Sequence, residues 1–223
     1  MFKDSREDIY DINVGFLGIF PRNIRVLIIG GGSVGFLKAK GLIKQGINNI
    51  DVISREFIDD FYKIKVNLIC EEVSIDILNK YHFIVVAVEE YKDIKAMLDN
   101  LNKLYVICAD SSEGNCFVPV VIKSRGFSLG ITSNGSPKGT CFLRDKILDS
   151  VLRYDEFLYE TRKIREEVKM LDEKDKIINF IYTDDFYFFY LKGKHNLVLE
   201  LFFGGFYDKG SNKKKHACTG SGR

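Results

Sequence analysis

A glycine-rich turn between a predicted strand and a predicted helix constrains this chain more than any other feature. Residues 26–29 are apolar and mostly β-branched, and they lead directly into the pattern G-x-G-x-x-G at Gly30, Gly32 and Gly35. A helical pattern follows over residues 36–45. This order of strand, tight turn and helix is typical of a parallel α/β sheet that binds a dinucleotide.

The spacing of the glycines assigns a separate task to each. Gly30 permits the sharp turn, Gly32 lets the backbone approach a pyrophosphate, and Gly35 lets the helix pack closely against the strand. The phosphates would lie at the start of the helix, where the backbone at Ser33 and Val34 offers free N–H groups. We therefore predict a dinucleotide site. The alternative is a glycine turn in an α/β protein whose cofactor site is lost or used otherwise.

The residues after the second predicted strand leave the identity of the dinucleotide open. An Asp or Glu usually follows this strand and binds the adenosine ribose. Here Ser54 and Arg55 hold that position, Glu56 comes one residue late, and Asp51 lies inside the strand. Arg55 could favour the 2′-phosphate of NADP, or it could be a solvated loop residue. We predict NAD as the cofactor, with Ser54 among its contacts.

The first hundred residues alternate between predicted strands and helices, as in a doubly wound sheet. The run over residues 83–88 is fully apolar, which is typical of a strand buried on both faces. A hairpin, a helix over 140–152 and a helix-rich final third follow. The expected fold is α/β, with a Rossmann-type parallel sheet over residues 1–112. A small α+β domain over residues 113–150 and a helical C-terminal domain with a frayed tail over residues 151–223 are expected to follow.

Two further elements follow from shorter patterns. Residues 13–20 are predicted to form a short strand before the glycine unit. Residues 177–189 are rich in aromatic side chains, and we predict that they are helical.

Composition and charge exclude several classes of protein. The chain has 33 Lys and Arg against 31 Asp and Glu, and a net charge of +2 does not suggest a nucleic-acid partner. No apolar run approaches the roughly 18 residues of a transmembrane helix, so we expect no membrane partner. The five cysteines form no C-x-x-C pair and indicate neither a structural zinc site nor a redox pair. Their odd number and the absence of a signal peptide predict a cytoplasmic protein.

Asp110 is the main candidate for chemistry outside the glycine turn. It closes the predicted strand over 104–108, and strand ends in such a sheet face the cofactor crevice, where a carboxylate could act as a general base. The other interpretation is an ordinary Asp that caps the following loop. Val88 and Glu89 end the neighbouring strand. Glu89 and Glu90 could bind at this edge, or they could be a charge pair at a helix N-terminus.

The order of these pieces resembles the precorrin-2 dehydrogenase family, the dehydrogenase/ferrochelatase module of siroheme synthases. The resemblance runs from about Val14 to Lys146, with a looser helical similarity to about Phe189. It implies an NAD-dependent oxidation of precorrin-2, a carboxylate-rich tetrapyrrole, to sirohydrochlorin. Some members also insert Fe²⁺ to give siroheme. The stretches that carry the resemblance are VLIIGGGSVGFLKAKGLI, FIVVAVEE and ICADSSEGNCFVPVVIKSRGFSLGITSNGSPKGTCFLRDKIL.

The resemblance also implies roles for residues and an oligomeric state. The essential Asp of the family falls on Asp110, and a serine that faces the tetrapyrrole matches Ser133, beside Asn134 in the same turn. Val88 and Glu89 fall on a signature at the cofactor side, where Val88 replaces the usual Thr. Members of the family are homodimers with a small dimerisation domain, so the resemblance implies a homodimer here, with residues 113–150 as its dimerisation domain.

Basic side chains suit the carboxylates of such a substrate, and Arg125, Lys138 or Arg144 are candidates to bind them. No Cys/His cluster stores a metal, so Fe²⁺ or Co²⁺ would be a chelation substrate and not a resident cofactor. Ile107 stands where the family often has Asn, and Val88 is a second departure. These two substitutions keep an alternative open, in which the protein is a non-catalytic sensor that binds NAD(H) and signals through its dimer.

Overall fold

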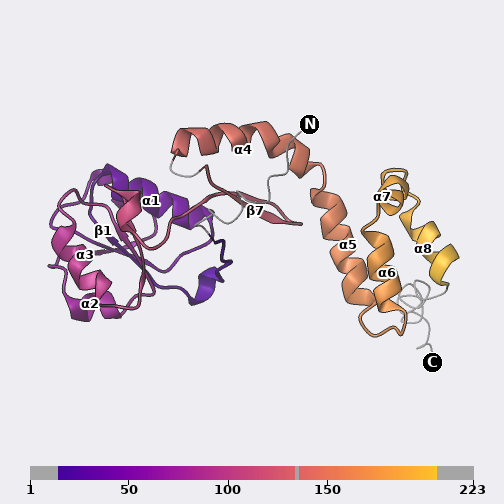
Figure 1. Ribbon diagram of the computed structural model, residues 1–223, viewed down its shortest axis with the longest axis horizontal. Coiled ribbons are helices and arrows are strands. Elements are labelled where there is room, and N and C mark those ends of the chain that lie inside the picture. The colour runs from indigo at the N-terminus through magenta and orange to yellow at the C-terminus, as the bar shows by residue number, and fades with distance from the viewer. Residues whose placement is uncertain (1–14, 134–135, 205–223) are drawn as a thin grey trace, which may run out of the picture. The chain divides into compact units, whose positions relative to one another are not determined.

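The computed structural model describes residues 15–133 and 136–204, and these form two compact units (Figure 1). The first unit comprises residues 1–121 and 130–141, and the second comprises residues 122–129 and 142–223. Each unit contains hydrophobic clusters of its own. The division into three domains with ends at residues 112 and 150 stays a prediction, and the predicted frayed tail lies largely outside the described residues.

A parallel sheet of five strands forms the centre of the first unit, with the strand order β3-β2-β1-β4-β5. The register pairs Ile29 with both Ile53 and Val86, and Val86 with Ile107, so four of the strands end level with one another. This is the Rossmann-type sheet that the sequence predicts. The strands are β1 (Val26–Ile29), β2 (Ile50–Ile53), β3 (Asn67–Ile69), β4 (Phe83–Val86) and β5 (Leu104–Ile107).

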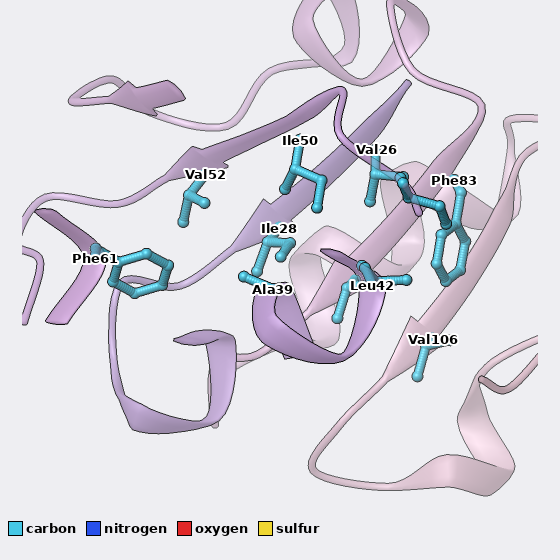
Figure 2. Packing of buried hydrophobic residues seen from close by; sticks show 11 residues of the cluster. Val26, Ile28, Ala39, Leu42, Ile50, Val52, Phe61, Phe83 and Val106 are labelled. Atoms are coloured by element: carbon cyan, nitrogen blue, oxygen red, sulfur yellow. The ribbon is translucent and has the colours of Figure 1, made fainter. Parts of the chain in front are cut away.

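Helices cover both faces of this sheet because successive residues of a strand point to opposite sides. Val26 and Ile28 of β1 pack in one cluster with Ala39 and Leu42 of α1 (Figure 2). The intervening residues of β1 join a second cluster, to which α2 and α3 contribute. The α-helices are α1 (Ser33–Lys44), α2 (Ile75–Asn79) and α3 (Lys92–Asp99), and the short 3-10 turns are η2 (Pro21–Asn23), η3 (Asp59–Lys63) and η4 (Ser111–Glu113).

The predicted hairpin and the helix after it are present. Strands β6 (Val120–Lys123) and β7 (Ser128–Ile131) form a two-stranded sheet, and α4 (Pro137–Leu152) follows. Helix α4 begins with Pro137. Proline lacks a backbone N–H, and this costs no hydrogen bond at the first helical position, where an N–H would have no intrahelical acceptor. The strand predicted over 13–20 is wrong for residues 15–20, which have no regular structure. No strand of the described chain pairs with them.

The second unit contains the helices α5 (Asp155–Glu167), α6 (Lys174–Ile181), α7 (Asp184–Leu191) and α8 (His195–Phe203), which confirms the helical C-terminal region. Its core includes Phe157, Ile177 and Phe186. The helical structure predicted over 177–189 is confirmed for residues 177–181 and 184–189, which belong to two separate helices, α6 and α7. The hydroxyl of Thr183 accepts from the N–H of Phe186 at 3.2 Å and so caps the start of α7.

Candidate active site

The ends of three neighbouring strands bring the predicted residues to one edge of the sheet. Gly30 directly follows β1, Val88 and Glu89 follow β4, and Asp110 follows β5. The three strands are parallel and adjacent, so these residues share the carboxyl edge, where open α/β sheets bind their ligands. Gly30 and Val88 lie next to each other, since a Cβ atom at Gly30 would be 3.1 Å from Cγ1 of Val88.

The backbone requires glycine at Gly30 and Gly35, the first and last glycines of the dinucleotide pattern. Gly30 has a φ of +120°, and a Cβ atom there would lie 2.7 Å from the carbonyl oxygen of Ala87. Its N–H donates to the carbonyl of Ile53 at 2.9 Å, which ties the turn to β2. At Gly35, a Cβ atom would lie 2.2 Å from the carbonyl oxygen of Gly30. Any side chain at either position would push the helix or the strand out of place.

Gly32 and the start of α1 form an open cradle for an anion. Gly32 is exposed, and a Cβ atom built on it would meet no atom within 4 Å. It is the N-cap of α1, and no side chain caps this helix. The first N–H groups of the helix, among them those of Ser33 and Val34, have no intrahelical acceptor because of helix geometry. The cradle therefore fits the pyrophosphate of a dinucleotide.

Sequence reasoning missed the role of Gly31. A Cβ atom at Gly31 would lie 2.1 Å from the carbonyl oxygen of Glu56, so the loop after β2 packs directly on the turn. The carbonyl of Gly31 also accepts from the N–H of Ile58 at 3.0 Å. The sequence did carry a signal for this role. Of the three consecutive glycines, the dinucleotide pattern requires only Gly30 and Gly32, so the glycine between them needs a reason of its own.

Ser54 and Arg55, and no acid, directly follow β2. Ser54 is half-buried, and its N–H donates to the carbonyl of Ile69 at 3.1 Å. The side chain of Arg55 is exposed and pairs with Glu72 at 2.9 Å. Glu56 meets the turn through its backbone, while its side chain is exposed. Both earlier interpretations of Arg55 remain compatible with this geometry.

Asp110 is exposed and caps η4, the short turn that follows β5. Its carboxylate accepts from the hydroxyl of Ser112 at 2.6 Å and from the N–H of Ser112 at 3.0 Å. The hydroxyl bond and then the backbone bond lower the pKa of Asp110 below its ordinary value, because both favour the charged form. Asp110 is therefore an ionised, solvent-facing carboxylate at neutral pH, which can accept a proton or meet a cation.

Asn115 holds the loop that carries Asp110 against the free edge of β5. Its side-chain oxygen accepts from the N–H of Tyr105, and its side-chain nitrogen donates to the carbonyl of Lys103, both at 2.7 Å. Glu113 adds an ion pair with Lys95 of α3 at 3.5 Å. Sequence reasoning missed Asn115, and a single Asn in a polar loop gives no signal that could have found it.

The predicted substrate residues lie in different surroundings. The hydroxyl of Ser133 donates to the carbonyl of Ser136 at 2.6 Å and lies 2.7 Å from the hydroxyl of Thr140, so it helps to order the start of α4. The hydroxyl oxygen of Ser133 can also accept a hydrogen bond from a ligand through its remaining lone pair. Asn134 lies outside the described residues. Arg125 belongs to the second unit.

In the second unit, the side chain of Arg125 contacts α5. Its guanidinium pairs with Glu156 at 3.6 Å and lies 3.9 Å from the ring centroid of Tyr159. Within residues 15–133 and 136–204, no group of three or more His, Cys, Asp and Glu side chains is placed to hold a metal ion. None of the helices in the described part of the chain is both long enough and apolar enough to cross a membrane.

A parallel sheet with a glycine turn and an open helix N-terminus at its carboxyl edge defines the class of Rossmann-type nucleotide-binding domains. Residues 18–120 match the model of a family described as putative NAD(P)-binding. That match and the cradle at Gly32 support a nicotinamide dinucleotide as the class of cofactor. The sequence has no significant match among curated proteins.

The fold is similar to that of SirC, a precorrin-2 dehydrogenase. The TM-score is 0.59 at 21% sequence identity, over 82% of this chain and 92% of that one. The fold of this chain is thus shared with a precorrin-2 dehydrogenase, the helical C-terminal region included. A crystal structure of E. coli MccB with ATP aligns over 38% of this chain and 36% of that one, with 16% identity and a TM-score of 0.30.

Proposed function

We propose that this protein is an NAD-dependent dehydrogenase that oxidises precorrin-2 to sirohydrochlorin. The single observation that carries the proposal is the carboxylate of Asp110 at the same sheet edge as the glycine cradle. The fold shared with SirC supports the choice of a tetrapyrrole substrate.

The residues of the chain divide the work of such an oxidation. Backbone N–H groups at the start of α1 bind the pyrophosphate, and Ser54, Val88 and Glu89 flank the bound dinucleotide. When bound, NAD⁺ supplies the acceptor for the hydride. Asp110 receives the proton that leaves the substrate in the same oxidation, because Ser112 keeps it in the charged form. The hydride and the proton together account for the two hydrogens that the substrate loses.

The substrate contacts are part of the same proposal. Ser133 and Asn134 would bind the tetrapyrrole, and Arg125 would meet one of its carboxylates, since a guanidinium binds carboxylates through charge-assisted hydrogen bonds. Insertion of Fe²⁺ or Co²⁺ is a second candidate activity. It is favoured by the exposed, ionised state of Asp110, which could accept protons from the pyrroles or guide the metal ion.

A homodimer in the cytoplasm completes the proposal. The segment before β1 exposes large apolar side chains, with Phe16, Leu17 and Phe20 exposed by 62%, 79% and 76%. Exposed apolar side chains concentrated in one short segment suit an interaction site, and a second copy of the chain would bury them. The alternative function is a dimeric sensor that binds NAD(H) without catalysis.

The test combines the purified protein with precorrin-2 and NAD⁺ and follows the absorbance of NADH and of sirohydrochlorin. We expect turnover by the wild type and a loss of about 100-fold or more in kcat for Asp110→Asn, because general base catalysis contributes about 10²–10⁴-fold. NADH affinity should stay unchanged in this variant. Asp76→Ala, which removes an exposed carboxylate on α2, is the control.

Each outcome of this experiment separates the candidates. Wild-type protein that leaves NAD⁺ unreduced refutes the dehydrogenase proposal. If the protein then binds NADH but not sirohydrochlorin, the sensor is favoured. Metal insertion is read separately, by mixing sirohydrochlorin with Fe²⁺ or Co²⁺. A rate no higher than without protein, or one unchanged in Asp110→Asn, excludes the chelatase role of Asp110.

A further inference from the structure

Helix α7 carries an exposed stripe of side chains that is apolar in the middle and charged at both ends. Asp184 is the first residue of the helix, Phe188 lies four residues later, and Lys192 directly follows the last residue. Side chains four residues apart lie on the same face of a helix, so these three form one row. Leu191 lies next to Phe188 on this face, at a spacing of three. All four side chains are exposed.

Another face of α7 already fills the core of the helical unit. Phe186 is fully buried, and Tyr187 and Tyr190 pack against the same cluster. Phe188 and Leu191 take no part in that core, because their side chains are exposed by 55% and 63%. Exposed apolar side chains of this size are unfavourable in water, and a docked partner would remove them from it.

The charges at the two ends of the stripe are available to a partner. The ion pairs of the helical unit, among the residues that the structure describes, involve neither Asp184 nor Lys192. The ammonium of Lys192 lies 5.7 Å from the ring centroid of Phe188, so it adjoins the apolar part of the stripe. An acid at the start of a helix and a base at its end also suit the helix dipole. The dipole does not require exposed apolar side chains between them.

The stripe is complementary to itself when two copies of α7 lie antiparallel. Phe188 is four residues away from both Asp184 and Lys192. If a two-fold axis passes beside Phe188, each Asp184 faces the partner's Lys192, and the apolar side chains of both copies meet between the two ion pairs. Symmetry repeats every contact of such an interface, so one stripe supplies both of its halves.

We propose that α7 is a docking surface for α7 of a second copy of this chain, packed antiparallel across a two-fold axis. This surface is distinct from the segment before β1. The inference goes beyond the proposed function and does not rest on it, because it involves neither the nucleotide nor the substrate. A helix of 8 residues is about 12 Å long, whereas a standard interface buries about 800 Å² on each partner. We therefore expect a weak association that depends on protein concentration.

The first test measures the molar mass by light scattering as the protein concentration is raised. Asp184→Lys and Lys192→Asp each place like charges opposite one another at both ends of the contact. We expect either change to weaken the self-association about tenfold, since two attractive pairs become repulsive. Asp175→Lys is the matched control, because it makes the same change at an exposed position of α6, and it should keep the wild-type mass. Circular dichroism checks that every variant keeps its helices.

The second test asks whether the two ends of the stripe face each other. In the double variant Asp184→Lys/Lys192→Asp, antiparallel packing again brings opposite charges together, so the self-association should return. An equimolar mixture of the two single variants should also associate, whereas Asp175→Lys mixed with Lys192→Asp should not. Leu191→Ser, which removes the apolar middle, should weaken the association without changing any charge.

Each outcome decides for or against the proposal. A wild-type mass that stays constant, or one that rises equally in both single variants, overturns it. Loss of association that neither the double variant nor the mixture restores overturns the antiparallel pairing. If the wild-type mass stays constant and Leu191→Ser abolishes binding to vesicles of anionic lipid, the stripe is a membrane contact instead. Turnover of precorrin-2 and affinity for NADH should stay at wild-type values in all variants, so failure of the proposed function is read separately, in the wild type.

Discussion

His195 begins α8 and places an imidazole ring among the aromatic side chains of the helical unit. Its ring centroid lies 5.2 Å from that of Tyr190 and 6.5 Å from that of Phe186. Its Nδ1 atom is buried and has no hydrogen-bond partner in the part of the chain that the structure describes. Burial lowers the pKa of His195 and outweighs the carboxylate of Glu160, which raises it. The folded unit therefore favours the neutral ring.

This shift predicts how the stability of the helical unit depends on pH. The unfolded chain takes up a proton near the ordinary pKa of about 6.5, whereas the folded unit resists protonation. The contribution of the neutral His195 to the free energy of unfolding is therefore complete above that pH. It is lost as the pH falls below it. We expect the free energy of unfolding in urea to fall less between pH 7 and pH 5 in His195→Gln than in the wild type. Equal slopes in the wild type and in His195→Gln would contradict this account.

At the scale of elements, β5 shows how an edge strand is closed by the loop that follows it. The strand is the last of the sheet, so one side of its backbone has no neighbouring strand. The N–H groups of Asn115 and Cys116 donate to the carbonyl of Tyr105 at 3.1 and 3.3 Å. The side-chain amide of Asn115 adds the two bonds that a further strand would have made. The same loop carries Asp110, so the contacts that close the edge of β5 also hold the candidate base in place.

Asn115 is therefore expected to control the order of this loop. Replacing it by Ala removes two hydrogen bonds and should lower the free energy of unfolding by about 1–2 kcal/mol. Hydrogen exchange at the amide of Tyr105 should become faster. In Asn115→Asp the acceptor for that amide remains while the donor to Lys103 is lost, so Tyr105 should keep its protection. Unchanged exchange at Tyr105 in Asn115→Ala would show that the loop is held by other contacts.

The sequence indicates elements well where the signal is local and poorly where it depends on distant residues. Strand β4 and the turn after β1 are visible because an apolar run and spaced glycines carry their own physical meaning. The break between α6 and α7 was missed although Thr183, Asp184 and Asp185 interrupt the apolar residues. Three polar residues in a row also fit the solvent-facing side of one helix, and the cap depends on one hydroxyl. Gly31 and Asn115 act on segments far along the chain, so their roles appear only once the chain is folded.

At the scale of the whole molecule, the two units have separate hydrophobic cores among the described residues. The clusters around the parallel sheet share no residue with the cluster of α5–α8. A ligand stabilises the unit that binds it. Since the glycine cradle belongs to the first unit, NADH should raise the thermal transition of that unit and leave the transition of the helical unit in place.

A substitution in the helical core tests this independence from the other side. Phe186 is fully buried, and its ring lies 5.4 Å from that of Phe180. Phe186→Ala should cost about 3–5 kcal/mol and lower the melting temperature of the helical unit, because a large cavity replaces the ring. Phe188, two residues further along α7, is 55% exposed, so Phe188→Ala is the matched control and should have a small effect. NADH affinity should stay at the wild-type value in both variants. Calorimetry that shows one common transition, shifted by Phe186→Ala and by NADH alike, would mean that the two cores unfold together.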